Sequence, residues 1–166
     1  MEIIQKSRKD GYVKLKVTSG DDLWYLHQVI GEGDRVKKRT MRTMLEGREK
    51  KSVVIEIEVE KTELQNDRLR LTGEIVKGAD NIELGYHTFN VQEDEELELW
   101  KDFADSEWDT LEKAASSEPY NVLFCRAEEG KADIYEVRES GIEDISTLSE
   151  NINGKMYSDQ KSPNFI

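Results

Sequence analysis

Hydrophobic and polar residues alternate in several short segments of the chain, which is the pattern of β-strands with one buried face. Residues 13–17 place apolar side chains at every second position with lysines between them, and residues 53–60 repeat the pattern with glutamates in most polar positions. Residues 68–72, 85–91 and 95–100 are further short candidates. The sequence therefore predicts a mainly β (α+β) fold built around a small, closed, barrel-like sheet.

In two other segments the apolar residues recur at the spacing of an α-helix instead. The first begins after Ser19, because Asp22 three residues later completes a capping box, and Gly31 or Gly33 can end the helix. Its apolar face recurs at positions i, i+3, i+4 and i+7 and comprises Leu23, Leu26, His27 and Ile30. The second helix is predicted over residues 106–116, and its corresponding face comprises Trp108, Leu111, Glu112 and Ala115.

The sequence also indicates where one domain ends and another begins. A Glu-Pro pair at 118–119 interrupts the helical pattern, and two strand candidates follow at 120–125 and 132–137, joined by a Gly-containing turn. We therefore expect a first domain over residues 1–118 and an incomplete α/β fragment over 119–166. This fragment is too short to bury a full core by itself, so it should either pack on the barrel or remain partly disordered.

Composition places the chain among folded, soluble proteins. Apolar residues make up 36% of the sequence and gather in the periodic segments. No apolar stretch approaches the roughly 20 residues that a membrane helix needs, so we expect a cytoplasmic protein with no membrane partner. The single cysteine, Cys125, cannot form an internal disulfide and lies in an apolar run, which predicts a small, buried core residue.

Charge is distributed very unevenly along the chain. The net charge is -12, yet residues 35–51 contain eight bases and only two acids. A basic segment in an otherwise acidic chain indicates contact with a polyanion, and phosphate backbones are the usual target. The alternative is a solvated β-hairpin whose lysines and arginines only face water. The acidic run at 93–97 would repel RNA, so we expect it to lie away from the basic segment.

Ordered motifs over most of the chain resemble those of the archaeal Pelota family. They are GYVKL at 11–15, DDLWYL at 21–26, GDRVKKRTMR at 33–42, IEVEKTEL at 57–64, DRLRLTGEIVKG at 67–78 and GYHTFNV at 85–91. Residues 128–143 resemble the first two strands of the family's central domain, and residues 152–161 resemble its basic loop. The resemblance implies an Sm-like barrel for the first domain, the opening of a release-factor-like central domain after it, and a chain that is truncated relative to the family.

The resemblance implies recognition of stalled ribosomes and mRNA surveillance (no-go decay and ribosome rescue), with the basic loop contacting RNA in the decoding site. The residues expected to bind RNA are Arg35, Lys37, Lys38, Arg39, Arg42, Arg48, Lys50, Lys51 and Lys155. The implied partners are the ribosome and mRNA. For full-length members they include an elongation-factor-1-alpha-like GTPase and a ribosome-splitting ABC ATPase, and the regions that bind the GTPase lie largely outside this chain.

Asp21 and Asp22 raise the hypothesis of an enzyme. Adjacent carboxylates can hold a divalent cation, magnesium or manganese, which activates water for phosphodiester cleavage. The resemblance then implies an endoribonuclease that cuts stalled mRNA. The structural interpretation, which the residues themselves favour, is that these acids cap the first turn of a helix and complement its dipole.

The sequence is also compatible with a function that involves no RNA, and its histidines have a structural interpretation. An Sm-like barrel can serve as a protein-interaction module with no role in RNA binding. His27 lies on the apolar helix face and is interpreted as a packed residue, while His87 has no neighbouring Cys or His that would indicate a zinc site.

Overall fold

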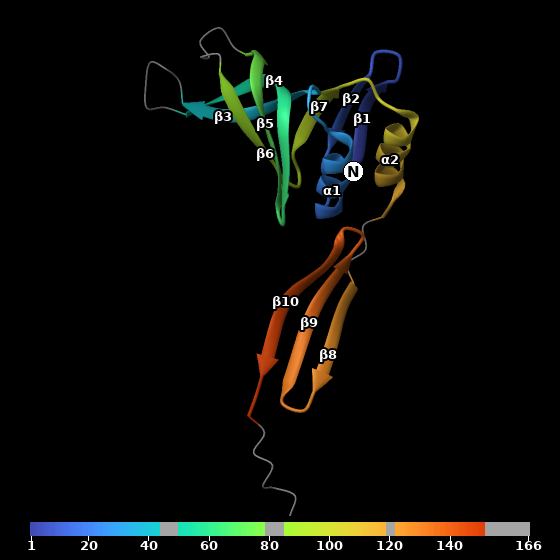
Figure 1. Cartoon of the computed structure of the whole chain (residues 1–166), viewed down its shortest axis with the longest axis vertical. Helices are drawn as coiled ribbons and strands as arrows, with labels where there is room; N and C mark the ends of the chain where they lie inside the picture. The colour runs from blue at the N-terminus through green and yellow to red at the C-terminus, as the bar shows by residue number, and fades with distance from the viewer. Residues whose placement is uncertain (44–49, 79–84, 119–121, 152–166) are drawn as a thin grey trace, which may run out of the picture. The chain divides into compact units, whose positions relative to one another are not determined.

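The computed structural model of the chain describes residues 1–43, 50–78, 85–118 and 122–151 (Figure 1). It divides the chain into two compact units, Met1–Pro119 and Tyr120–Ile166, close to the boundary predicted at about residue 118. None of the helices in the described ranges is long and apolar enough to cross a membrane.

Strands dominate both units, and the predicted mainly β fold with two helices is confirmed. In chain order the elements are β1 (Glu2–Ser7), β2 (Tyr12–Lys16), α1 (Gly20–Val29), β3 (Arg35–Thr43), β4 (Lys50–Gln65), β5 (Arg68–Lys77), β6 (Tyr86–Val91), β7 (Glu96–Trp100), α2 (Asp105–Ser116), β8 (Val122–Glu128), β9 (Lys131–Arg138) and β10 (Gly141–Ser149).

The first unit is built on one antiparallel sheet. Its strand order is β1-β2-β7-β3-β4-β5-β6, so β1 and β6 are the edges of the ladder over the described residues (Figure 1). Over the described residues, no pairing between these two edge strands closes the sheet. β4 pairs with β3 and with β5, and two register shifts along the β4–β5 ladder bend these long strands.

Alternation buries one face of this sheet, as the sequence pattern predicts. Apolar side chains at alternate positions of β2, β5 and β7 are buried, among them Leu15, Leu71 and Leu99. Helix α1 packs against β4, β5 and α2, and it adds Leu26 to the same core. The core thus lies between the apolar face of the sheet and the two helices.

Helix α1 has the start and the end that the sequence predicts. The Asp22 carboxylate accepts a hydrogen bond from the Ser19 N–H at 3.1 Å, which satisfies a backbone donor at the start of the helix. The Ile30 N–H donates to the Leu26 carbonyl at 2.8 Å and closes the last turn. Leu23, Leu26 and Ile30 are buried, whereas His27 is only partly buried.

Helix α2 differs from its prediction at two points. It begins at Asp105, and its first turn is capped by Glu107, whose carboxylate accepts a hydrogen bond from the Ala104 N–H at 2.9 Å. The predicted buried position Ala115 is wrong, because Ala114 is buried and Ala115 is exposed. Trp108, Leu111 and Ala114 form one i, i+3, i+6 row, which is the face that contacts the core.

Leu23→Ala is expected to lower the free energy of unfolding by about 2–5 kcal/mol, the usual range for truncating a buried leucine. Leu23 is 1% exposed and sits on the core face of α1. Urea denaturation of the variant measures the effect, and Gln28→Ala on the exposed face of the same helix is the matched control. A change below about 0.5 kcal/mol, as is usual for a surface position, would show that this face of α1 is not packed.

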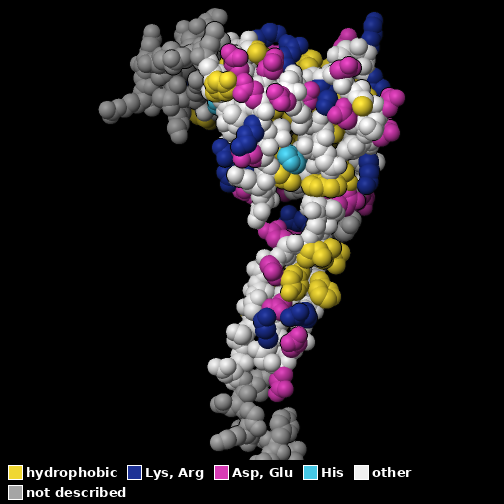
Figure 2. Space-filling view, viewed as in Figure 1, with side chains coloured by type: hydrophobic (Ala, Val, Ile, Leu, Met, Phe, Trp, Pro, Cys, Tyr) yellow, Lys and Arg dark blue, Asp and Glu magenta, His cyan; other side chains and the backbone are white. Residues whose placement is uncertain are grey.

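The second unit is a separate antiparallel sheet in the order β10-β9-β8. The strand pair β8 and β9 was predicted, and β10 was not. All of β8 and β10 is exposed, and the predicted burial of Cys125 is wrong because this cysteine lies on exposed β8. Figure 2 shows hydrophobic side chains gathered on the surface of this unit. An apolar run buries its residues only when a second layer covers the sheet, and local sequence does not reveal that layer.

Candidate nucleic-acid interface

The basic segment of the sequence folds into β3 and the start of β4. The two strands pair in continuous register from Arg35↔Glu58 to Thr43↔Lys50. Alternation buries Val36 and leaves Arg39 on the outer side of the sheet. The predicted cationic strand or loop is therefore a β-hairpin. The side chains of Arg42 and Lys50, and the whole of Arg48 and Lys155, lie outside the described part of the chain.

The acidic segment at 93–97 lies directly beside the basic strands, and the expectation that it would lie apart is wrong. β7 pairs with β2 on one side and with the first residues of β3 on the other. Its acids and those of the preceding turn form ion pairs with lysines of both neighbours: Lys14–Glu96 at 3.0 Å, Lys16–Asp94 at 3.1 Å, Lys37–Glu98 at 3.1 Å and Lys38–Glu95 at 2.7 Å. The prediction considered only repulsion between this acidic segment and RNA. Attraction between opposite charges on adjacent strands favours the observed position instead.

The lysine of one of these pairs is buried. Lys38 is 8% exposed, and its ammonium also donates to the Arg39 carbonyl at 3.3 Å. Glu95 in turn accepts a hydrogen bond from the Gln92 N–H at 2.8 Å. Lys38 therefore connects the hairpin to the turn before β7, and its ammonium is directed into the protein.

The remaining bases of the hairpin fall into two groups. Arg35 forms an ion pair with the buried carboxylate of Glu56 at 3.2 Å, and Lys77 approaches the same carboxylate at 3.7 Å. Arg39 and Lys51 are exposed, and neither forms an ion pair with any residue in the described part of the chain. These two cations face solvent without an acidic partner among the residues that the structure describes.

Two aromatic side chains continue the outer face of the same strands. Tyr12 and Trp100 are directly paired across β2 and β7, with ring centroids 5.1 Å apart. The Lys37 ammonium lies 5.8 Å from the Trp100 ring. Burial raises the pKa of Tyr12, and so does the Glu98 carboxylate that accepts its hydroxyl hydrogen bond at 3.1 Å. The Tyr12 and Trp100 rings therefore form a flat apolar surface beside the Lys37 ammonium.

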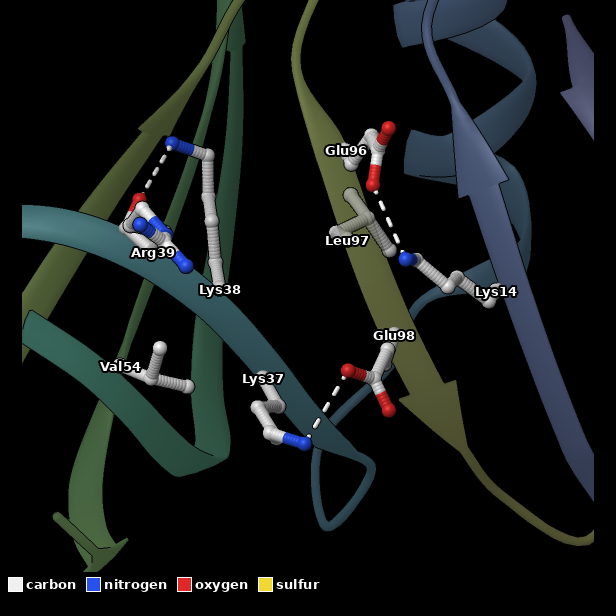
Figure 3. A pocket seen from close by; sticks show the side chains of 8 residues that line it. All are labelled: Lys14, Lys37, Lys38, Arg39, Val54, Glu96, Leu97 and Glu98. Carbon is white, nitrogen blue, oxygen red and sulfur yellow. Dashed lines mark hydrogen bonds and ion pairs between the residues drawn. The ribbon is translucent and has the colours of Figure 1, made fainter. Parts of the chain in front are cut away.

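A pocket of about 150 Å³ opens where β3 separates from β7 (Figure 3). The β3–β7 ladder ends at Lys37↔Glu98, and beyond this pair β3 continues only along β4. The pocket is lined by four bases, two acids and two apolar residues: Lys14, Lys37, Lys38, Arg39, Glu96, Glu98, Val54 and Leu97. Figure 3 shows the Lys14–Glu96 and Lys37–Glu98 pairs among the residues that line it.

On the face drawn in Figure 2, positive charge does not form a single-sign patch on the first unit. Figure 2 shows Lys and Arg side chains interspersed with Asp and Glu over the visible face. Sequence analysis missed Lys14, Glu96 and Glu98 as parts of this surface. The alternating lysines of β2 and glutamates of β7 were a usable signal, because they have the same spacing and opposite charge.

Asp21 and Asp22 are held inside the first unit. Both are buried, and Asp22 Oδ2 contacts the ammonium of Met1 at 2.7 Å and the N–H and hydroxyl of Thr18 at 2.7 and 3.0 Å. The described residues contain no group of three or more His, Cys, Asp and Glu side chains that could hold a metal ion. A buried carboxylate already surrounded by donors does not fit a catalytic cation, so we derive no cleavage step through these acids.

The two histidines lie on separate elements. His27 is on α1, and His87 is on β6, where its ring packs edge-on against Phe89 with centroids 5.0 Å apart. These surroundings are those of packed side chains, and the geometry of neither histidine indicates a general base.

Comparison with known proteins gives one consistent family. Residues 1–115 match the family model of the Pelota N-terminal domain. The pelota homolog of Pyrococcus furiosus is 33% identical over 174 residues, which cover 95% of this chain and 48% of the relative. This chain spans about half the length of the curated relatives that it matches.

Solved structures agree with this match. The crystal structure of the Thermoplasma acidophilum Pelota protein has a TM-score of 0.75 and 23% identity, covering 95% of this chain and 47% of its own, which shows a shared fold. A model of ribosome-bound archaeal Pelota and ABCE1 has a TM-score of 0.59 and 29% identity, covering 98% of this chain and 50% of its own. With its N-terminal unit matched almost throughout, the chain belongs to the Pelota family.

Proposed function

We propose that this chain functions in ribosome rescue and mRNA surveillance, and that its β3–β4 hairpin contacts RNA in the decoding site of the ribosome. Membership of the Pelota family supports the first part, because one similar structure is of an archaeal Pelota in its ribosome-bound form. The charge distribution supports the second part, because residues 35–51 hold eight bases in a chain whose net charge is -12.

The observation that carries the proposal is the position of Arg39 and Lys51 on opposite strands of the hairpin. Both side chains are exposed and form no ion pair within the described ranges. A surface cation without an acidic partner keeps its attraction for phosphate, and phosphate binding releases counterions from the RNA. Arg42, Arg48 and Lys50 continue the same basic segment and belong to the proposed contact region by sequence.

The partners follow from the same proposal. They are the ribosome and its mRNA, in the cytoplasm, and an ATPase of the ABCE1 kind that the similar ribosome-bound structure includes. An elongation-factor-like GTPase is proposed only for longer members of the family, because this chain spans about half of its relatives.

The double variant Arg39→Ala with Lys51→Ala is expected to bind single-stranded RNA more weakly and with a shallower salt dependence. Each lost single-strand phosphate contact removes about 0.7 from the slope of log K against log salt, so the pair should remove about 1.4. Fluorescence anisotropy of a labelled oligouridine over a salt series measures both quantities.

The matched control removes two surface lysines elsewhere, Lys9→Ala with Lys61→Ala, and so changes net charge by the same amount. We expect this control to keep nearly the parent's slope, since neither lysine lies within the basic segment of residues 35–51. Equal slopes for the hairpin variant and the parent would contradict the proposal. RNA binding by the parent that does not respond to salt, or no binding at all, would favour a protein-interaction module instead.

A further inference from the structure

The acids around β7 contact the lysines of β2 and β3 in two different ways. Three pairs, Lys14–Glu96, Lys16–Asp94 and Lys37–Glu98, lie on the outer face, and their side chains are between 24% and 89% exposed. In the fourth pair, Lys38–Glu95, the side chain of the lysine is only 7% exposed. Both members of each outer pair are therefore open to solvent, whereas the lysine of the inner pair is enclosed.

Exposure makes the outer pairs exchangeable. An ion pair in contact with water gains little net free energy and is screened by salt, so another anion of similar geometry can replace the carboxylate. The inner pair is different, because separating a buried ammonium from its partner leaves an uncompensated charge in the protein. The lysines that can change partner are thus Lys14, Lys16 and Lys37.

Two of these lysines, Lys14 and Lys37, line the same pocket as Arg39 of the proposed RNA contact. Lys14 and Lys37 both stand opposite Glu98 in the ladders of β2–β7 and β3–β7. Strands lie about 4.8 Å apart, so the two lysines are roughly 10 Å apart across β7. Arg39, which has no acidic partner in the described ranges, lines the same pocket and continues the row onto the hairpin (Figure 3).

We propose that the outer face of β2, β7 and β3 is a second site for the phosphate backbone of single-stranded RNA, in which Glu96 and Glu98 occupy the lysines until phosphates replace them. The inference rests on the proposed function, because it extends RNA contact from the hairpin onto the sheet. The carboxylates lower the affinity of this face for polyanions. They thereby confine strong contact to RNA that Arg39 and the hairpin already hold. Tyr12 and Trp100, at the end of the same row, offer flat rings on which a base can stack.

Neutralising the two carboxylates is the direct test. Glu96→Gln with Glu98→Gln keeps the side-chain size and frees Lys14 and Lys37. We expect about tenfold tighter binding of a labelled oligouridine at low salt, and a slope of log K against log salt steeper by about 1.4, because two lysines gain phosphate contacts. The control Glu93→Gln removes a neighbouring exposed acid that forms no ion pair in the described ranges, and it should change affinity much less.

A reversal experiment identifies the groups responsible. Adding Lys14→Gln and Lys37→Gln to the double glutamine variant should abolish the gain in affinity, while thermal melting followed by circular dichroism confirms that every variant is folded. The proposal of a second site is wrong if the Glu96→Gln, Glu98→Gln variant binds oligouridine no more tightly than the Glu93→Gln variant. It is also wrong if the gain in affinity remains after both lysines are replaced. In either case the hairpin proposal stands as long as the Arg39→Ala, Lys51→Ala variant still loses affinity. If that variant also binds like the parent, both proposals fail together.

Discussion

Replacing Asp22 by asparagine is expected to lower the free energy of unfolding by about 3–5 kcal/mol, because it removes one partner of a buried ion pair. The Asp22 carboxylate is 2% exposed and lies 2.7 Å from the Met1 ammonium, whose side of the pair is fully buried. It also accepts hydrogen bonds from Thr18 and Ser19 at the start of α1. Asparagine keeps an acceptor for the helix start but leaves the ammonium without a counter-charge. Urea denaturation measures the loss.

Asp105→Asn is the matched control, because Asp105 is an exposed acid in the first turn of the other helix. That substitution removes an interaction with the helix dipole, which contributes about 0.3–1 kcal/mol, and an attraction to the exposed Arg8 guanidinium. A loss of less than about 1 kcal/mol for Asp22→Asn would show that the carboxylate is only a helix cap. Incubating both proteins with labelled RNA and magnesium or manganese tests the endoribonuclease hypothesis separately. Metal-dependent cleavage by the parent that Asp22→Asn abolishes at equal folded concentration would overturn the structural role.

Gly73→Ala is expected to destabilise the first unit by about 3 kcal/mol, the upper end of the usual cost of overpacking. Gly73 lies in β5 opposite Val59, next to a register shift in the β4–β5 ladder. A Cβ atom at this position would overlap the Glu58 carbonyl oxygen, which is backbone and cannot rotate away. The strands would have to separate at the point where the sheet bends.

Gly85→Ala serves as its control, since an added Cβ there meets no atom within 4 Å. We expect Gly85→Ala to change the free energy of unfolding by less than about 1 kcal/mol, as Gly-to-Ala changes do at unstrained positions. Thermal and urea denaturation of the two variants give the comparison. Equal stabilities would mean that the β4–β5 ladder can shift to admit a side chain at position 73.

Local features of the fold follow from the sequence alone. The alternation in β2 and β5, and the capping of α1 by Asp22, involve residues close together in the chain, so their pattern is visible without a structure. The basic character of β3 is equally evident from the eight bases in residues 35–51. These features predicted the mainly β fold and identified the β3–β4 hairpin as the region of the proposed RNA contact.

Tertiary structure alone decided which charges are available. Lys37 and Glu98 are 61 positions apart, yet strand order places them 3.1 Å apart; Lys38 and Glu95 meet in the same way. Strand order also determines that Arg39 has no acid opposite it within the described residues. The number of charged residues can be read from the sequence, but their ion-pair partners cannot, because pairing depends on which strands become neighbours.

The same limit explains Cys125 and Asp22. The apolar run around Cys125 predicts burial, but burial requires a covering layer that the strand itself does not encode, and the cysteine is exposed. Asp22 could be recognised as a cap from its neighbours, whereas its contact with the Met1 ammonium depends on β1 and β2 bringing the chain start beside α1. Short-range interactions are therefore determined by the sequence directly, while charge compensation and exposure are determined by the packing of elements distant in the chain.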